Sequence, residues 1–392
     1  MKLRALVVAA AAVAGLAGSP ATHAQEVRIG LLTTLTGPLA ALGQHVRDGF
    51  ALAVEEAGGK LGGVETKVIV EDDQLRPDVA VQLATKLAER EKVQILTGVI
   101  FSNVAMAVAK PTAENKVFFV SPNAGPSALA GKQCSPWFYA TAWQNDQPHE
   151  AMGAHLQAEG VKKVYLLAPN YNAGKDALHG FKRAYKGTVV GESYPSMNQL
   201  DFAAEISQIR AAKPDAVYVF LAGGMGINFT KQYAQARLAA EIPMYSAFTI
   251  DAITLPAVGE AAVGTFQSNL WNADLKIPAN QKFVAAFQKK YGYLPSNYAA
   301  QSYDTARLID AALRATGGKT EDKKAFAAAL RNAKFDSVRG PFAFNTNNFP
   351  IGNFYLIETV KRPDGGVEQV TRKTMLTNAK DAYYGECRMA GL

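Results

Sequence analysis

Long hydrophobic runs are scarce in this sequence of 392 residues. The longest, from Ala5 to Ala17, is too short to cross a membrane, which takes roughly 20 apolar residues. Lys2 and Arg4 precede this run, and residues 22–24 place small side chains where a signal peptidase cleaves. The pattern predicts a secretory signal peptide over residues 1–24, with no lipidated cysteine after it, and therefore a periplasmic protein without a membrane anchor.

Cysteine is also rare, because the chain has only Cys134 and Cys387. An even pair in an oxidising compartment favours one disulfide, which would tie the C-terminal tail back to the middle of the chain. Two free buried thiols are the alternative. We expect the disulfide, because the tail around Tyr383 and Tyr384 has little else to hold it.

Clustered positive charge is absent as well. Lys and Arg outnumber Asp and Glu by 41 to 34, but no basic run is longer than two residues. Nucleic-acid binding requires basic side chains gathered on one face, so we expect no nucleic-acid partner. The positive net charge is still compatible with a mildly basic cleft that favours anionic solutes.

The motifs of enzymes are missing too. The sequence has no Gly-x-Ser-x-Gly, no His-Glu-x-x-His and no phosphate-binding glycine loop. His45, His149, His155 and His179 lack the spacing of metal ligands. We therefore expect a protein that is not an enzyme and holds neither a metal nor a cofactor.

What the sequence does contain is a regular alternation of short apolar runs with amphipathic stretches. Residues 27–32 read as a buried strand, and Val46, Phe50 and Val54 recur at helical spacing before Gly58-Gly59 ends that helix. The same rhythm continues to residue 220, and the two halves look alike. The alternation predicts an α/β fold with parallel sheets, and 368 residues after cleavage exceed one ordinary domain.

In open α/β sheets, ligands bind beyond the carboxyl ends of the strands. Six loops in this sequence follow predicted strands and are rich in Gly, Ser, Asn or Pro. They are residues 33–39, 98–103, 121–125, 169–174, 222–226 and 246–251. Together they could surround one small molecule in a cleft.

The loop that ends in Phe101-Ser102-Asn103 leads into a predicted helix. Ser102 or Asn103 could simply cap that helix. The free N–H groups of a helix N-terminus also suit a carboxylate. Asn123-Ala124 repeat the arrangement after the next strand, so we favour an acid-binding site made by two converging helix N-termini.

Three residues of the second half are weaker candidates. Tyr171 follows a strand and could stack on a ligand or only cover its own loop. Gly223 and Met225 lie in a glycine-rich segment where the backbone could approach a ligand, although a simple bend is equally compatible with that segment.

The order and spacing of these pieces resemble the leucine/isoleucine/valine-binding protein family, the periplasmic receptors of ABC importers. Telling segments are residues 29–38, 48–63, 98–102, 201–206, 300–306 and 340–342. The resemblance covers essentially the whole mature chain. It implies two Rossmann-like lobes joined by three crossovers, with the ligand trapped by hinge closure.

The resemblance also assigns segments and roles. It implies a first lobe of residues 25–142 with 271–345, and a second lobe of 143–270 with 346–392 including the tail. Ser102 matches the serine that binds the ligand carboxylate, Asn123-Ala124 fall where that grip is completed, and Tyr171 matches a tyrosine that covers the ligand. ABC permease subunits are the implied protein partners, and we expect a monomer.

One departure from the family narrows the ligand. Amino-acid receptors place an acidic residue against the ligand ammonium where this chain has Ala247-Phe248-Thr249, and Asp251 lies further on. A buried ammonium without a carboxylate costs several kcal/mol. Phe101 and Phe248 suit a flat aromatic acid instead, and residues 98–103 resemble the benzoate-type branch. A branched-chain amino acid receptor that uses Asp251, and an amide or urea receptor that uses Thr249 and Asn123, stay open.

Overall fold

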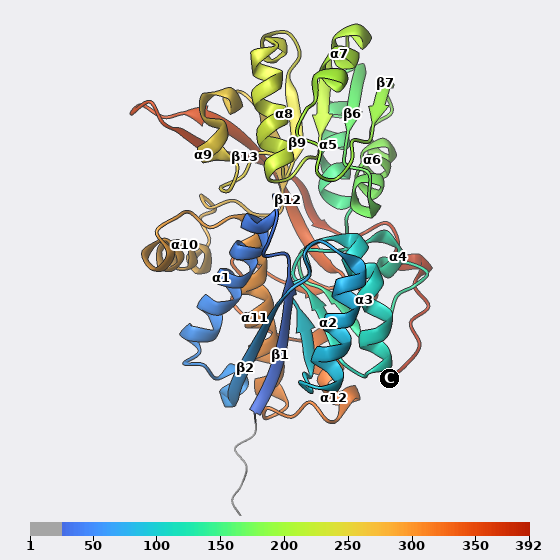
Figure 1. Cartoon of the computed structure of the whole chain (residues 1–392), viewed down its shortest axis with the longest axis vertical. Coiled ribbons are helices and arrows are strands. Elements are labelled where there is room, and N and C mark those ends of the chain that lie inside the picture. The colour runs from blue at the N-terminus through green and yellow to red at the C-terminus, as the bar shows by residue number, and fades with distance from the viewer. Residues whose placement is uncertain (1–25) are drawn as a thin grey trace, which may run out of the picture.

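The computed structural model describes residues 26–392, which form two lobes stacked along the long axis of the molecule (Figure 1). The predicted signal peptide, residues 1–24, lies outside the described residues. No helix in the described part of the chain is long and apolar enough to cross a membrane.

The first lobe is built on a five-stranded parallel sheet in the order β2-β1-β3-β4-β5. Its strands are β1 (Glu26–Thr33), β2 (Glu65–Asp72), β3 (Ile95–Thr97), β4 (Phe118–Ser121) and β5 (Phe138–Ala140). Its helices are α1 (Ala40–Glu56), α2 (Pro77–Glu89), α3 (Ser102–Glu114), α4 (Ser127–Ala130), α10 (Pro278–Tyr291), α11 (Asn297–Ala315) and α12 (Lys323–Arg331).

The second lobe repeats this strand order in its parallel core, β7-β6-β8-β9-β10. The core strands are β6 (Lys163–Leu167), β7 (Thr188–Ser193), β8 (Ala216–Val219), β9 (Met244–Ala247) and β10 (Phe266–Asn269). Around them lie α5 (Gln147–Ala158), α6 (Asn172–Ala184), α7 (Ala203–Ala212), α8 (Gly224–Gln235) and α9 (Leu255–Val258). The predicted two-lobed α/β fold is confirmed.

An antiparallel edge, which the sequence reading did not anticipate, extends this second sheet. The long strands β12 (Pro350–Lys361) and β13 (Val367–Ala379) pair with each other, and β12 also pairs with β10. The two-residue strand β11 (Ala343–Phe344) pairs with the start of β12. The sheet is therefore mixed rather than wholly parallel.

Burial explains why the central strands are continuous apolar runs. Ile29 and Leu31 of β1 are almost fully buried, as expected for a parallel sheet covered on both faces. Gly30 lies between them, and a Cβ added there would come within 2.9 Å of Leu87 Cδ1 on α2. On α1, Val46 and Phe50 are completely buried, because their helical spacing turns them inward.

The chain crosses between the lobes at three places, after β5, after β10 and after β11. The fold thus has the three crossovers that the family resemblance implies. After β13 the tail returns to the first lobe, where Cys387 is bonded to Cys134. The predicted disulfide is confirmed, and the exact lobe boundaries stay predictions.

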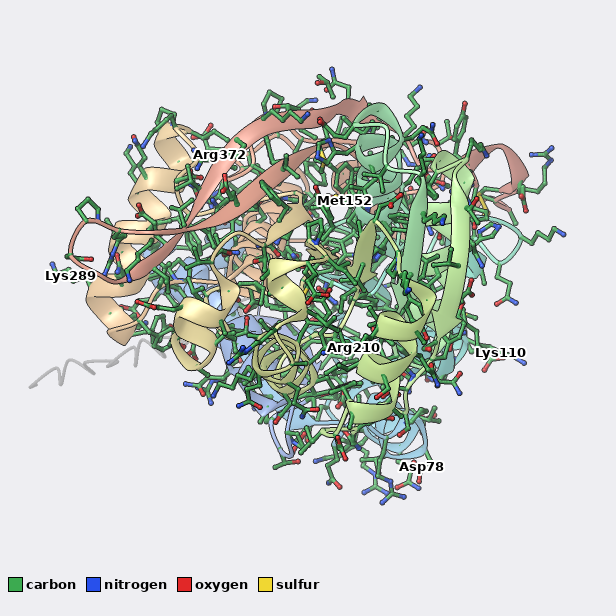
Figure 2. The ribbon with its side chains drawn as sticks, turned by 90° about the horizontal axis from the view of Figure 1, so that it is seen from above. Asp78, Lys110, Met152, Arg210, Lys289 and Arg372 are labelled. Atoms are coloured by element: carbon green, nitrogen blue, oxygen red, sulfur yellow. A yellow bond between two sulfur atoms is a disulfide. The ribbon has the colours of Figure 1, made fainter. Side chains whose placement is uncertain are left out.

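Charged side chains are dispersed over the surface. Lys110 and Lys289 are exposed and lie on opposite sides of the molecule (Figure 2).

Candidate ligand-binding site

A small, partly open cavity lies where the two lobes meet. Half of its fourteen lining residues carry an aromatic ring. Within the described part of the chain, no lining residue is charged at neutral pH. The lining residues are Leu42, Ile100, Phe101, Ser102, Asn123, Trp143, Asn145, His149, Tyr171, Ala173, Phe220, Ala222, Phe248 and Tyr298. Both lobes and the first crossover contribute, as expected of a site formed by closure.

The aromatic walls contact one another across the cavity. Phe248 stacks on Trp143 of the crossover, with ring centroids 4.5 Å apart and planes tilted by 21°. Phe101 of the first lobe meets Tyr171 of the second at 6.3 Å. Phe248 also has a positive φ of 57°, a conformation that costs a bulky residue on the order of 1–3 kcal/mol and is commonly retained at functional sites.

Four helices begin at this cavity. Each places a lining residue within its first three positions: Ser102 on α3, His149 on α5, Ala173 on α6 and Tyr298 on α11. A helix N-terminus carries a partial positive charge, worth about 0.3–1 kcal/mol to a nearby anion. On α5 the N–H groups of Gln147 and His149 already bond to the carbonyls of Gln144 and Asp146, so that helix contributes its dipole but no free donor. The cavity is thus favourable to an anion although no cationic side chain lines it.

Ser102 does not cap α3, in contrast to one of the two sequence interpretations. The helix begins at Ser102 and its N-cap position is Phe101. The Ser102 Oγ instead accepts a hydrogen bond of 3.0 Å from Nδ2 of Asn145. Because that amide nitrogen can only donate, the proton of the Ser102 hydroxyl is left to donate to a ligand.

The second predicted helix N-terminus, at Asn123-Ala124, is absent. The chain forms a loop there, and only the four-residue α4 follows at Ser127. Asn123 lines the cavity, and its Nδ2 donates to the carbonyl of Ile100 over 2.7 Å. Ala124 and Asn103 are not among the lining residues. The site therefore rests on one of the two predicted N-termini, joined by three others that the sequence reading did not identify.

His149 is a neutral hydrogen-bonding group in the cavity wall. Complete burial lowers its pKa to about 3, so the imidazole is uncharged at neutral pH. Its Nδ1 is hydrogen-bonded to the hydroxyl of Tyr218, which has no other side-chain partner within residues 26–392. If the Tyr218 proton were not donated to Nδ1 it would be buried without an acceptor, which costs about 1–3 kcal/mol. The His149 proton therefore belongs on Nε2.

The model of the family described as periplasmic binding protein matches residues 26–366. The chain belongs to the periplasmic binding protein family. Leu/Ile/Val-binding protein homolog 6 of Brucella melitensis biotype 1 is 30% identical to it, over 93% of this chain and 95% of that protein.

Two solved structures are similar to this periplasmic binding protein over almost their whole length. The ABC-transporter solute-binding protein of R. palustris in complex with benzoate has a TM-score of 0.87 at 33% identity, covering 93% of this chain and 99% of that one. The solute-binding protein of Rhodopseudomonas palustris BisB5 in complex with 3,4-dihydroxy benzoic acid has a TM-score of 0.86 at 30% identity, covering 91% and 99%.

The structure brings five of the ten predicted site residues of this binding protein to the cavity: Phe101, Ser102, Asn123, Tyr171 and Phe248. Asn103, Ala124, Gly223, Met225 and Thr249 do not line it. The Thr249 hydroxyl accepts from the backbone N–H of Leu221 over 3.0 Å and so holds two loops together. Met225 is buried in the core of the second lobe. Their contact with a ligand stays a prediction.

Several lining residues were missed by the sequence reading. Trp143 entered the sequence prediction only as the first residue of the second lobe, and His149 only as a possible metal ligand. Phe220 directly follows β8, and Tyr298 lies at the start of α11. Their position in the sequence could have identified them, because each lies close to the end of a strand or the start of a helix.

Gly223 marks a contact between the lobes of this binding protein. A Cβ added there would lie 2.9 Å from Leu39 Cδ2 and 3.1 Å from Leu42 Cδ1, both in the first lobe. We expect Gly223→Ala to hinder closure and weaken ligand binding by roughly fivefold or more, the effect of about 1 kcal/mol of overpacking. Isothermal titration calorimetry would measure this change.

Gly259→Ala is the matched control for that variant. Gly259 has the same φ of 57° and a ψ of −135°, against −131° at Gly223. An added Cβ there would meet nothing within 4 Å. Both variants carry the same backbone penalty, so both should lower the melting temperature, while only Gly223→Ala lowers affinity. Equal affinities would remove Gly223 from the closing contact.

Proposed function

We propose that this chain is the periplasmic substrate-binding component of an ABC importer and captures a small aromatic carboxylate by hinge closure. The observation that carries the proposal is the cavity itself, which has aromatic walls, four helix N-termini and no charged side chain among its lining residues. Solved relatives in complex with benzoate and dihydroxybenzoate support the same ligand class.

The two parts of such a ligand fit different parts of the site. The carboxylate accepts from the hydroxyl of Ser102 and from the free N–H groups at the start of α3. The ring packs among Phe248, Trp143 and Tyr171, where aromatic pairs contribute about 0.5–1.5 kcal/mol beyond area burial. The Nε2–H of His149 remains as a donor for a ring substituent.

Asp251 supports the aromatic acid over an amino acid. Its Oδ1 accepts from the backbone N–H groups of Ile253 and Thr254, each over 2.9 Å, and it is not among the residues that line the cavity. Burial raises its pKa to about 6. Oδ1 closes the turn of Asp251 itself, and no acidic side chain is among the cavity lining, so a ligand ammonium would have no acidic partner there.

Localisation and partners follow from this proposal. We infer a periplasmic, monomeric receptor exported by its signal peptide, which delivers its ligand to permease subunits in the inner membrane. The alternative is a receptor for an amide or urea, which would also be bound by uncharged hydrogen-bond donors. Neither role requires a cofactor or catalysis.

Thermal shift followed by calorimetry tests the ligand class. Benzoate, 4-hydroxybenzoate, leucine, valine, benzamide and urea would be compared, because a ligand at 100 times its Kd stabilises the folded state by about 2.7 kcal/mol. We expect benzoate or 4-hydroxybenzoate to raise the melting temperature and the others to leave it unchanged. Tight binding of leucine or valine with none of the aromatic acids would contradict the proposal.

A further inference from the structure

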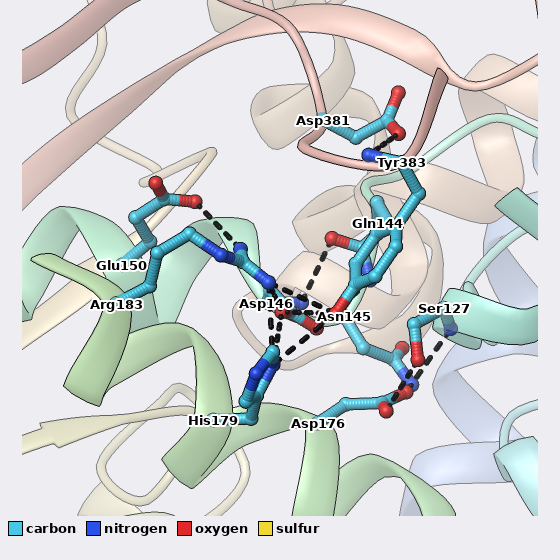
Figure 3. A network of polar contacts seen from close by, with 10 residues as sticks. All are labelled: Ser127, Gln144, Asn145, Asp146, Glu150, Asp176, His179, Arg183, Asp381 and Tyr383. Atoms are coloured by element: carbon cyan, nitrogen blue, oxygen red, sulfur yellow. Dashed lines mark hydrogen bonds and ion pairs between the residues drawn. The ribbon is translucent and has the colours of Figure 1, made fainter. Parts of the chain in front are cut away.

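One carboxylate of the second lobe bonds directly to the first. Asp176 lies on α6, and its Oδ1 accepts from the Ser127 hydroxyl over 2.5 Å, while its Oδ2 accepts from the Ser127 backbone N–H over 3.1 Å (Figure 3). Ser127 opens α4 in the first lobe. These contacts exist only while the lobes are together.

The same carboxylate reaches the ligand cavity through one intermediate. Nδ2 of Asn145 donates to Asp176 Oδ2 over 2.9 Å and also to Ser102 Oγ over 3.0 Å. An amide nitrogen has two protons, so each contact uses one of them. Asp176 therefore orients the side-chain amide of Asn145. Because that amide donates to Ser102 Oγ, the hydroxyl proton of Ser102 remains available to the ligand.

The hinge point lies directly beside this chain of contacts. Asn145 is tied to the first lobe, because its backbone N–H and its Oδ1 bond to the carbonyl and N–H of Gly125 over 2.8 and 3.2 Å. The next residue, Asp146, is tied to the second lobe, where its Oδ2 accepts from Arg183 on α6 over 2.5 Å (Figure 3). The tail bonds to the same carboxylate, because the Tyr383 hydroxyl donates to Asp146 Oδ2 over 2.8 Å (Figure 3). A rotation between residues 145 and 146 would separate Asp176 from Ser127.

We propose that Asp176 is an interlobe latch, coupled to the ligand through the positioning residue Asn145, and that it populates the closed arrangement before a ligand arrives. The coupling to an acid ligand rests on the proposed function, whereas the latch itself does not. A protein whose competent state is populated to a fraction f has its apparent Kd raised by the factor 1/f. Losing the latch should therefore weaken every ligand of the cavity by the factor by which f falls.

Interlobe distance in the absence of ligand tests the latch. Spin labels on Lys110→Cys in α3 and Arg210→Cys in α7 report on the two lobes, since both positions are exposed (Figure 2). Wild type should show a closed population, and Asp176→Ala and Ser127→Ala should each shift it to longer distances. Ser127→Ala leaves the backbone N–H contact to Asp176 Oδ2, so its shift should be the smaller of the two. The double variant should do no more than Asp176→Ala alone, because Asp176→Ala already removes both contacts.

Asp364→Asn is the control, since it removes the same charge from an exposed turn of the second lobe. It should leave the distance distribution as in wild type, and melting temperatures confirm that each variant folds. A wild-type protein without a closed population, or an Asp176→Ala distribution equal to wild type, would overturn the latch. If no aromatic acid binds, the proposed ligand is wrong, but the distance measurement still decides on the latch.

Discussion

Removal of the Cys134–Cys387 disulfide is expected to lower the free energy of unfolding by about 3–5 kcal/mol. The bond joins residues 253 positions apart, and the entropy that a crosslink removes from the unfolded chain grows with the length of the closed loop. It also holds the tail, in which Asp381 bonds to Asn347 and Tyr383 to Asp146. Denaturant unfolding of Cys134→Ser/Cys387→Ser against wild type measures the loss.

Reductant distinguishes the bond from the substitutions. Wild type treated with dithiothreitol should match the double variant, while the double variant itself should not respond to dithiothreitol. Identical unfolding curves for oxidised and reduced wild type would show that the crosslink adds nothing to stability.

Ser102→Ala is expected to weaken binding of an aromatic acid by about 1–3 kcal/mol, which is roughly 5–150-fold in Kd. The variant removes the donor to the carboxylate and leaves the Asn145 amide without one of its two acceptors. Calorimetry with the tightest acid from the ligand panel measures the change.

Thr112→Val provides the comparison for that variant. Thr112 is buried on the same helix, but its hydroxyl donates to the carbonyl of Val108 over 2.8 Å and lies outside the cavity lining. Affinity should be unchanged in Thr112→Val. If both variants bound equally well, Ser102 would have no part in holding the carboxylate.

The sequence could predict the first-lobe site because that site depends on local signals. Residues 95–97 form a buried strand, and Phe101 and Ser102 follow at the start of a helix, so strand period and helix spacing suffice to place them. Cys134 and Cys387 were paired from the compartment alone. The alternation of strands and helices predicted the parallel sheets of an α/β fold, but not the order of their strands.

The parts of the site that the sequence did not predict depend on which residues the fold brings together across the hinge. Trp143 and Phe248 lie far apart in the sequence and stack only because the crossover passes over the second lobe. Whether Asp251 faces the cavity or closes its own turn depends on the turn at Ile253 and Thr254, which residue types alone do not determine. The antiparallel strands β12 and β13 follow one another without an intervening helix, so the alternation of strands and helices did not predict them.

The four helix N-termini at the cavity have a consequence for delivery of the cargo. Two of them, on α3 and α11, belong to the first lobe, and two, on α5 and α6, belong to the second. When the lobes part, the positive field at the ligand is divided between two surfaces that water can reach, where it is screened. On the proposed function, opening would thus weaken the binding of an anion without breaking an ion pair or transferring a proton, so separation of the lobes would suffice to release the ligand.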